Sequence, residues 1–490
     1  MLTSQLLPQA STPHVLFFPH LAHGHAIPLL DISKALVGRG VKVTVVTTKK
    51  NEPFIQSRVT SCPGISVRVL KFPESARKLL PDGCENTADL PSMELFVEFL
   101  DALRTLKEPF ESLLEEMSRD GLLPSCVISD FFIGWTLGSC RAYGIPRVVF
   151  HGMGVFSIVV AKTAHMHVAC GRLHVNSDCF NDQTVDLSST KIPFSVKVGD
   201  VPDMDRYKDP ADRFLRVLAE IGVTDAHSDG ILVNSFEGIE GEYVSSLKSF
   251  CINERARIWC VGPASLYEDH PLPASFSNPY VKWLDERLGD DTKVMYVSFG
   301  TQARISDLQM DEIARGLEES GHYFLWAARP KDGKGEETAP AEGGKGLVVR
   351  GWVDQRQVLS HPAVEGFMSH CGWNSVLESL SNGVPMLTWG MEADQTLNAK
   401  LVVEGLRAGL TIPVGKAERD GFVPREAIRE GVKELMGGEK GKAVRGRAKQ
   451  IAGAAREAVG NEGSSRKSLD EFVEFVSERN DQSLKFPSIN

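Results

Sequence analysis

Apolar runs and amphipathic segments alternate along most of the chain, a pattern typical of repeated strand-helix units. Residues 14–20 are mostly apolar, residues 28–40 carry apolar side chains at helical spacing, and residues 41–48 form a second apolar run. Strands that are buried on both faces of a parallel sheet produce such nearly continuous runs. The order strand, helix, strand therefore predicts a parallel, doubly wound sheet.

A second series of strands and helices follows a segment at 267–279 that is rich in Pro, Ser and acidic residues, as linkers often are. The pattern thus predicts two α/β domains and a final helix. We expect an N-terminal domain at 1–252, a linker at 253–290, a C-terminal domain at 291–468, and a last helix and tail at 469–490.

The sequence also predicts the local structure of three segments. Residues 94–117 have the spacing of one long amphipathic helix, which we expect to form a wall over a cleft. Residues 155–213 predict a helix followed by surface loops. Residues 331–346 are charged and rich in glycine, and we expect them to be mobile.

Composition narrows the classes of function. The chain has 490 residues and a formal net charge of −10, which argues against nucleic acid or an anionic membrane as a general partner. The 9 cysteines are scattered and form no CxxC pair, which favours free thiols in a reducing compartment over disulfides or a zinc site. We see no leader peptide and no run of 18 apolar residues, and therefore expect a cytoplasmic protein.

The most informative turn begins at the end of the apolar run at 364–370. It contains His370, Gly372, Asn374 and Ser375, directly before a helical pattern that ends at residues 382–383. A helix N-terminus offers free backbone N–H groups and a partial positive charge, and a glycine lets an anion approach the backbone closely. One turn into this helix, Glu378 could accept hydrogen bonds from sugar hydroxyls. The turn therefore predicts a site for a phosphate-bearing ligand.

The stretch from residue 352 to 395 resembles the signature box of plant UDP-dependent glycosyltransferases. Ten positions match with their spacing kept: Trp352, Gln355, His370, Gly372, Trp373, Asn374, Ser375, Glu378, Asp394 and Gln395. The resemblance implies the GT-B architecture, in which two Rossmann-like doubly wound domains face each other across a cleft. It also implies that the last helix crosses back onto the N-terminal domain.

The resemblance assigns a part of the UDP-sugar to each matched position. Trp352, beside Val353, would stack on the uracil ring, and Gln355 and Glu378 would hold the ribose. His370, Asn374 and Ser375 would bind the diphosphate, together with Thr301 after the apolar run at 294–300; Ser298 is a weaker candidate. Trp373, Asp394 and Gln395 would line the hexose, and a Gln at the last position resembles the members that use glucose. Alternatively, both Trp residues are core aromatics and Glu378 lies on a solvated helix face.

Two further residues match the catalytic pair of this family. His25 follows the first apolar run and would act as general base, and Asp130, at the end of another apolar run, would orient it. A solvated histidine and a helix N-cap are the alternatives. His23 and His25 form an HxH pair, but no third ligand is visible, so we expect no metal.

The implied reaction is transfer of glucose from UDP-glucose to a hydroxyl of a small lipophilic acceptor, with inversion and without a metal or other cofactor. Flavonoids or other phenolics are the first acceptors to consider, and we expect a monomer. Transfer to carbon, a terpenoid or hormone acceptor, a UDP-sugar epimerase and a non-catalytic binding protein remain as alternatives.

Overall fold

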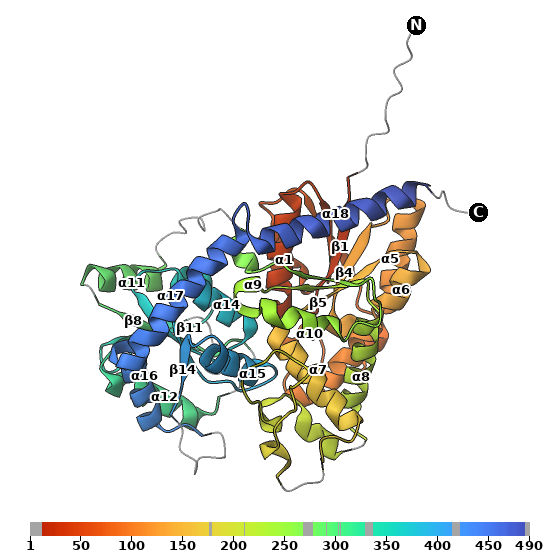
Figure 1. Ribbon diagram of the computed structural model, residues 1–490. Coiled ribbons are helices and arrows are strands. Elements are labelled where there is room, and N and C mark those ends of the chain that lie inside the picture. Colours follow the sequence, from red (N-terminus) through yellow and green to blue (C-terminus); the bar gives the residue numbers. More distant parts are fainter. Residues whose placement is uncertain are drawn as a thin grey trace.

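The computed structural model describes residues 12–175, 179–209, 211–267, 278–290, 292–301, 303, 305–328, 337–413 and 422–485 (Figure 1). Two seven-stranded sheets form its two halves. The strands of the first sheet are all parallel, in the order β3-β2-β1-β4-β5-β6-β7. They are β1 (His14–Phe18), β2 (Lys42–Thr48), β3 (Ile65–Leu70), β4 (Cys126–Asp130), β5 (Arg147–His151), β6 (Gly230–Val233) and β7 (Arg257–Cys260).

The second sheet has the order β10-β11-β9-β8-β12-β13-β14. Its strands are parallel except for the edge strand β10, which pairs antiparallel with β11. They are β8 (Val294–Ser298), β9 (Tyr323–Ala328), β10 (Glu337–Pro340), β11 (Gly346–Arg350), β12 (Val364–Ser369), β13 (Met386–Thr388) and β14 (Gly409–Thr411). The prediction of two doubly wound α/β halves is confirmed.

Helices pack around both sheets. Those of the first half include α1 (His23–Val37), α2 (Glu52–Val59), α4 (Phe96–Arg104), α5 (Lys107–Arg119), α6 (Thr136–Ala142), α7 (Val155–Ala169), α8 (Arg213–Ala226), α9 (Glu237–Glu240) and α10 (Val244–Lys248). Those of the second include α11 (Pro279–Gly289), α12 (Asp307–Ser320), α13 (Gln355–Leu359), α14 (Trp373–Ser381), α15 (Gln395–Lys400), α16 (Arg425–Gly437) and α17 (Glu439–Val459). None of the helices described here is both long and apolar enough to cross a membrane.

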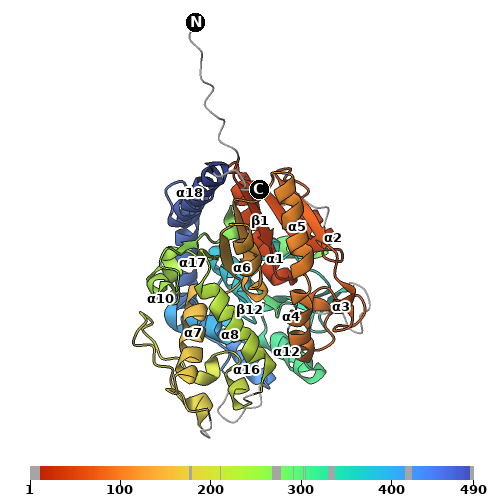
Figure 2. The ribbon, with the colours of Figure 1, turned by 90° about the vertical axis from the view of Figure 1, so that its right-hand side faces the viewer.

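The last helix, α18 (Ser464–Lys485), leaves the second half and lies along the first (Figure 1 and Figure 2). Its apolar side chains Leu469, Phe472, Phe475 and Val476 belong to the core beneath the first sheet. The ring of Phe472 packs edge-on against Trp259 of β7, with 5.1 Å between centroids. The two halves are therefore joined both by the segment after β7 and by this returning helix.

The long helix expected at 94–117 is two helices, α4 and α5, with a break at Thr105 and Leu106. Pro109 explains the break, because a proline ring clashes with the carbonyl four residues earlier, here that of Thr105. The first helix also differs from expectation, since it begins at His23 and encloses Pro28.

The expected linker at 253–290 contains two ordered elements. Its residues 257–260 are β7, the last strand of the first sheet, and its residues 279–289 are α11, whose Tyr280 and Leu284 are buried. Most of the Pro- and Ser-rich segment, 268–277, lies outside the described residues. In the excursion expected to be mobile, residues 337–340 form β10, while residues 331–336 also lie outside them.

Candidate functional site

The strand order of each sheet reverses at one point, and the candidate residues follow the strands that meet there. In the first sheet these strands are β1, followed by His25, and β4, which ends at Asp130. In the second sheet they are β8, followed by Thr301, and β12, followed by His370. Ligands of doubly wound sheets bind at such switch points. Here the two face one cavity of about 2280 Å³ lined from both halves.

His25 and Asp130 form a close pair. Nδ1 of His25 lies 2.7 Å from Oδ2 of Asp130, whose side chain is fully buried, while the imidazole is 24% exposed. The other oxygen of Asp130 accepts a hydrogen bond from the backbone N–H of Phe132 at 3.0 Å. Asp130 therefore caps the short helix at Phe131–Ile133 and orients His25 at the same time, so both interpretations of this residue apply.

The charges of this pair stabilise each other. Burial by itself lowers the pKa of His25, but the charge and hydrogen bond of Asp130 outweigh it and raise that pKa above its ordinary value of 6.5. Burial by itself raises the pKa of Asp130, yet His25 holds it below its ordinary value of 3.8. With Nδ1 bonded to the carboxylate, Nε2 is the ring atom left to exchange a proton with a ligand.

Aromatic side chains surround the histidine. The rings of Phe131 and Phe132 lie 6.1 and 5.9 Å from that of His25, and the buried ring of His20 lies 5.1 Å away. Burial and the nearby His25 lower the pKa of His20 to about 3, so it is neutral. The other member of the HxH pair, His23, stacks on Phe54 at 4.2 Å. In the part of the chain described here, no three His, Cys, Asp or Glu side chains are grouped as metal ligands.

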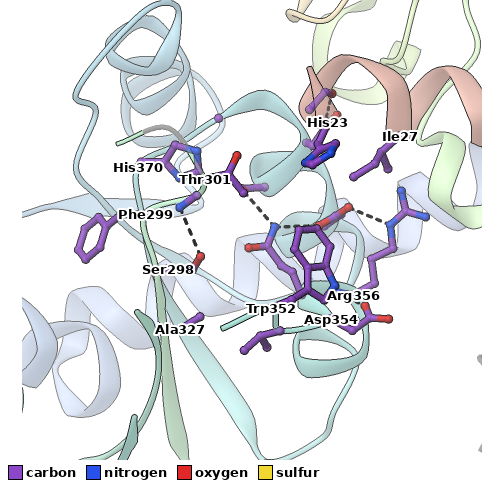
Figure 3. Close-up of a pocket in the computed structure, with 18 of the residues that line it drawn as sticks. His23, Ile27, Ser298, Phe299, Thr301, Ala327, Trp352, Asp354, Arg356 and His370 are labelled. Atoms are coloured by element: carbon purple, nitrogen blue, oxygen red, sulfur yellow. Dashed lines mark hydrogen bonds and ion pairs between the residues drawn. The ribbon is translucent and has the colours of Figure 1, made fainter. Parts of the chain in front are cut away.

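Across the cavity, the imidazole of His370 sits between two glycines. A Cβ atom added to Gly300 or to Gly372 would lie 2.7 Å from Nε2 of His370, so neither position has room for a side chain without moving the ring. Burial lowers the pKa of His370 to about 4, and the ring is neutral. Figure 3 shows His370 and Thr301 close to each other at this end of the cavity.

Trp373 opens α14, and the five residues that follow include three of the predicted donor-site residues, Asn374, Ser375 and Glu378. Ser375 Oγ accepts a hydrogen bond at 3.0 Å from Gln355 Nε2, which also donates to Glu378 Oε2 at 2.8 Å. The other carboxylate oxygen of Glu378 accepts from Arg356 Nε at 2.9 Å. Both Gln355 and Arg356 begin α13, which Asp354 caps through its side chain. Glu378 is thus a buried, hydrogen-bonded group and not part of a solvated helix face.

The two tryptophans of the box have opposite environments. Trp352 is 52% exposed at the cavity, next to the buried Val353, so its ring face is available to a ligand. Trp373 is only 3% exposed, and its indole N–H donates to the backbone carbonyl of Asn234 in the first half at 2.8 Å. Trp373 is therefore a core aromatic at the junction of the halves, although it also contributes to the cavity wall.

Asp394 and Gln395 also line the cavity, and Asp394 is near enough to His25 to help raise its pKa. Burial raises the pKa of Asp394, and its carboxylate accepts a hydrogen bond from Asn398 Nδ2 at 2.8 Å. Gln395 Oε1 accepts from the backbone N–H groups of Met391 and Glu392, at 3.2 and 3.0 Å. The side-chain amide group of Gln395 remains as its hydrogen-bond donor.

A direct hydrogen bond connects the two sides of the cavity. Asn374 Nδ2 donates to the backbone carbonyl of Gly24 at 2.7 Å. In a regular helix that carbonyl would accept from the N–H of residue 28, but Pro28 has none. The proline within α1 therefore leaves a carbonyl free for the opposite half, immediately before His25.

All the predicted site residues line this cavity except Asp130, which lies behind His25. Sequence reasoning missed Asp31, Arg356 and Asn398. Asn398 is fully buried. Its Nδ2 donates hydrogen bonds to Asp394 and to the backbone carbonyl of Cys371, and its Oδ1 accepts one from Ser157 Oγ of the first half. The spacing of Asn398 from Asp394, one helical turn, was a signal that could have identified it.

Comparisons with known proteins identify the family of the chain. Residues 272–430 match the family described as UDP-glucoronosyl and UDP-glucosyl transferase. UDP-glycosyltransferase 90A1 of Arabidopsis thaliana is 38% identical, covering 93% of this chain and 95% of its own, and scopoletin glucosyltransferase of Nicotiana tabacum is 34% identical, covering 95% and 98%.

Among solved structures, UGT2 of Phytolacca americana complexed with UDP-2fluoro-glucose and pterostilbene superposes with a TM-score of 0.76 at 26% identity. The match covers 95% of this chain and 100% of that one. The similarity to these relatives over nearly the whole chain, together with the fold, shows that the chain belongs to the UDP-glycosyltransferase family of plants.

Proposed function

We propose that this protein transfers glucose from UDP-glucose to a hydroxyl group of a small phenolic acceptor, releasing UDP and forming a β-glucoside. One observation carries the proposal: His25, held from behind by Asp130, and residues of the turn at 370–375 line the same cavity from opposite halves. A base and a diphosphate site must face each other across the sugar for a direct displacement.

In the proposed reaction, Nε2 of His25 takes the proton of the acceptor hydroxyl while Asp130 stabilises the imidazolium that forms. The acceptor oxygen bonds to the anomeric carbon as the bond from that carbon to the diphosphate oxygen breaks. Displacement from the opposite side inverts the anomeric centre. The electron pair of the broken bond leaves with UDP.

The departing diphosphate would be held by protein groups. We assign this role to the first N–H groups of α14, to His370, Asn374 and Ser375, and to Thr301. Trp352 would stack on the uracil ring, and Glu378 with Gln355 would bind the ribose. Since these groups supply the stabilisation, we propose that no divalent metal is needed, and expect turnover to be unchanged in EDTA.

Glucose and a phenol are the substrates that we favour. The amide group of Gln395 is available as a donor to sugar hydroxyls, and a relative is named a glucosyltransferase. A phenolic hydroxyl has a pKa near 10 and loses its proton to a histidine more readily than an alcohol does. The aromatic rings around His25 suit a flat, lipophilic acceptor. Scopoletin and pterostilbene, named with two similar proteins, are both phenols.

The test is incubation with UDP-glucose and a mixed panel of phenolics, terpenoids and hormones, read by mass spectrometry. A gain of one hexose on phenolics, in an acid-labile product, is the expected result. An acid-stable product would indicate transfer to carbon, and interconversion of the UDP-sugar without an acceptor would indicate an epimerase.

His25→Ala should lower kcat by about 10³-fold or more, while the affinity for UDP stays within about threefold, because only the base is lost. His23→Ala is the matched control, since that ring stacks on Phe54 and is not bonded to Asp130; most turnover should remain. Full turnover in His25→Ala would remove this residue as the base.

A further inference from the structure

One side chain of the second half reaches into the first beside the donor site. Arg356, at the start of α13, forms an ion pair through its terminal guanidinium nitrogen with Oδ2 of Asp31 in α1. Its Nε donates to Glu378 at 2.9 Å. Figure 3 shows the side chain of Arg356 extending toward Ile27 of α1. The guanidinium thus bridges two carboxylates that belong to different halves.

This bridge is largely withdrawn from water. The side chains of Asp31, Glu378 and Arg356 are 4%, 10% and 24% exposed. A carboxylate that loses its hydration needs a partner, and removing one member of a buried pair leaves an uncompensated charge. Among the described residues, Arg356 is the cation that pairs with Asp31. Contact between the halves at this point therefore depends on the arginine.

The bridge continues into the donor site. Glu378 Oε2 accepts from Gln355 Nε2, which also donates to Ser375 Oγ. A connected series of polar contacts thus runs from Asp31 through Arg356, Glu378 and Gln355 to Ser375 on α14. At its other end, Asp31 shares the helix α1 with His25, which lies about 1.7 turns earlier.

We propose that Arg356 is a positioning residue that couples binding of the nucleotide to the placement of α1, and with it His25, against the donor. The inference rests on the proposed role of Glu378 and Gln355 in holding the ribose. A carboxylate oxygen has two lone pairs, so Glu378 can keep its bond to Arg356 while it accepts from ribose hydroxyls. By linkage, whatever favours contact between Asp31 and Arg356 also favours nucleotide binding, and the reverse.

The coupling is measured by titration calorimetry of UDP into the wild-type protein, Arg356→Gln, Asp31→Asn and the double variant. Arg356→Gln should weaken UDP binding about tenfold or more, because Glu378 loses its partner and its orientation. Asp31→Asn should weaken it about fivefold. The double variant should bind no more weakly than Arg356→Gln alone, since Asp31 acts through the arginine.

Two further variants separate positioning from general stability. Arg356→Lys keeps the charge but lacks the fork that reaches two carboxylates, and should bind UDP with intermediate affinity. Lys400→Gln is the matched control. Lys400 Nζ lies 3.7 Å from Asp200, an ion pair that also joins the two halves, and neither residue lines the cavity. It should leave UDP affinity within about twofold. Thermal unfolding without UDP shows how far each variant is destabilised.

Turnover at saturating UDP-glucose tests the placement of His25 separately from UDP binding. Asp31→Asn leaves every donor-site residue in place, yet kcat should fall about fivefold or more, because α1 is held less firmly against the donor. UDP affinity in Arg356→Gln equal to the wild type, or fully additive losses in the double variant, would overturn the inference. Wild-type protein that binds no UDP would overturn the proposed function as well.

Discussion

At the residue scale, the behaviour of His25 follows from what touches each of its nitrogens. Asp130 accepts from Nδ1 with one oxygen and caps a short helix with the other, so the carboxylate is fixed at both ends. A fixed acceptor selects one tautomer and leaves Nε2 as the basic atom. The buried, neutral His20 next to it adds no competing charge.

The pH dependence of turnover tests this arrangement. Asp130 raises the pKa of His25 above 6.5, and a base works only when neutral, so the acid limb of kcat/KM should lie above that value. In Asp130→Asn the larger raising charge is gone, while the smaller one of Asp394 and the burial that lowers the pKa of His25 remain. The acid limb should move to lower pH, and the plateau should fall about 10²- to 10⁴-fold. An acid limb at the same pH in both proteins would show that Asp130 does not control His25.

At the element scale, the turn from β12 into α14 forms the centre of the candidate donor site. The end of β12 and the N-terminus of the helix leave backbone N–H groups at the cavity, and two glycines leave room for the ring of His370. The same scale explains the contact from Asn374 to Gly24, which exists because Pro28 interrupts the hydrogen bonds of α1.

Replacing Gly372 by Ala should turn the ring of His370 aside. The added Cβ would lie 2.7 Å from Nε2, at the end of a side chain that can rotate, so the fold should survive while a hydrogen bond to the diphosphate is lost. UDP affinity should fall about tenfold or more, measured by calorimetry. Gly446→Ala is the control. That position in α17 has nothing within 4 Å of an added Cβ, and the change should leave UDP affinity unaltered and stabilise the helix slightly.

At the scale of the whole molecule, the chain ties its halves together twice. It passes from the first sheet to the second after β7, and α18 then returns to the first. The aromatic side chains of α18 close the core beneath β7, so the end of the sequence stabilises its beginning.

Truncation of Phe472 tests the importance of this return. Phe472→Ala should lower the free energy of unfolding of the first half by about 3–5 kcal/mol, because a fully buried ring is removed from Trp259 and its neighbours. Urea denaturation followed by circular dichroism measures the change. The exposed Glu474 of the same helix provides the control, and Glu474→Ala should stay within about 0.5 kcal/mol of the wild type. Equal effects of the two substitutions would mean that α18 is not part of the core.

The sequence by itself determined the two doubly wound halves and the position of each candidate residue along its strand or turn. Apolar period and turn residues are local properties, and parallel strands bring their carboxyl ends to one edge, so His25, Asp130 and His370 could be assigned to strand ends in advance. Local patterns failed where one residue broke a period, as Pro109 does between α4 and α5.

Only the tertiary structure decided how the halves meet. Asp31 and Arg356 are 325 positions apart, and Asn374 and Gly24 are 350 apart, so no periodicity relates them. It also decided that Trp352 is exposed while Trp373 is buried, since burial depends on what the opposite half covers. The physical reason is that helical and strand spacing reports only which face of an element is apolar, whereas pairing of charges across a cleft depends on side chains that distant segments bring within bonding distance.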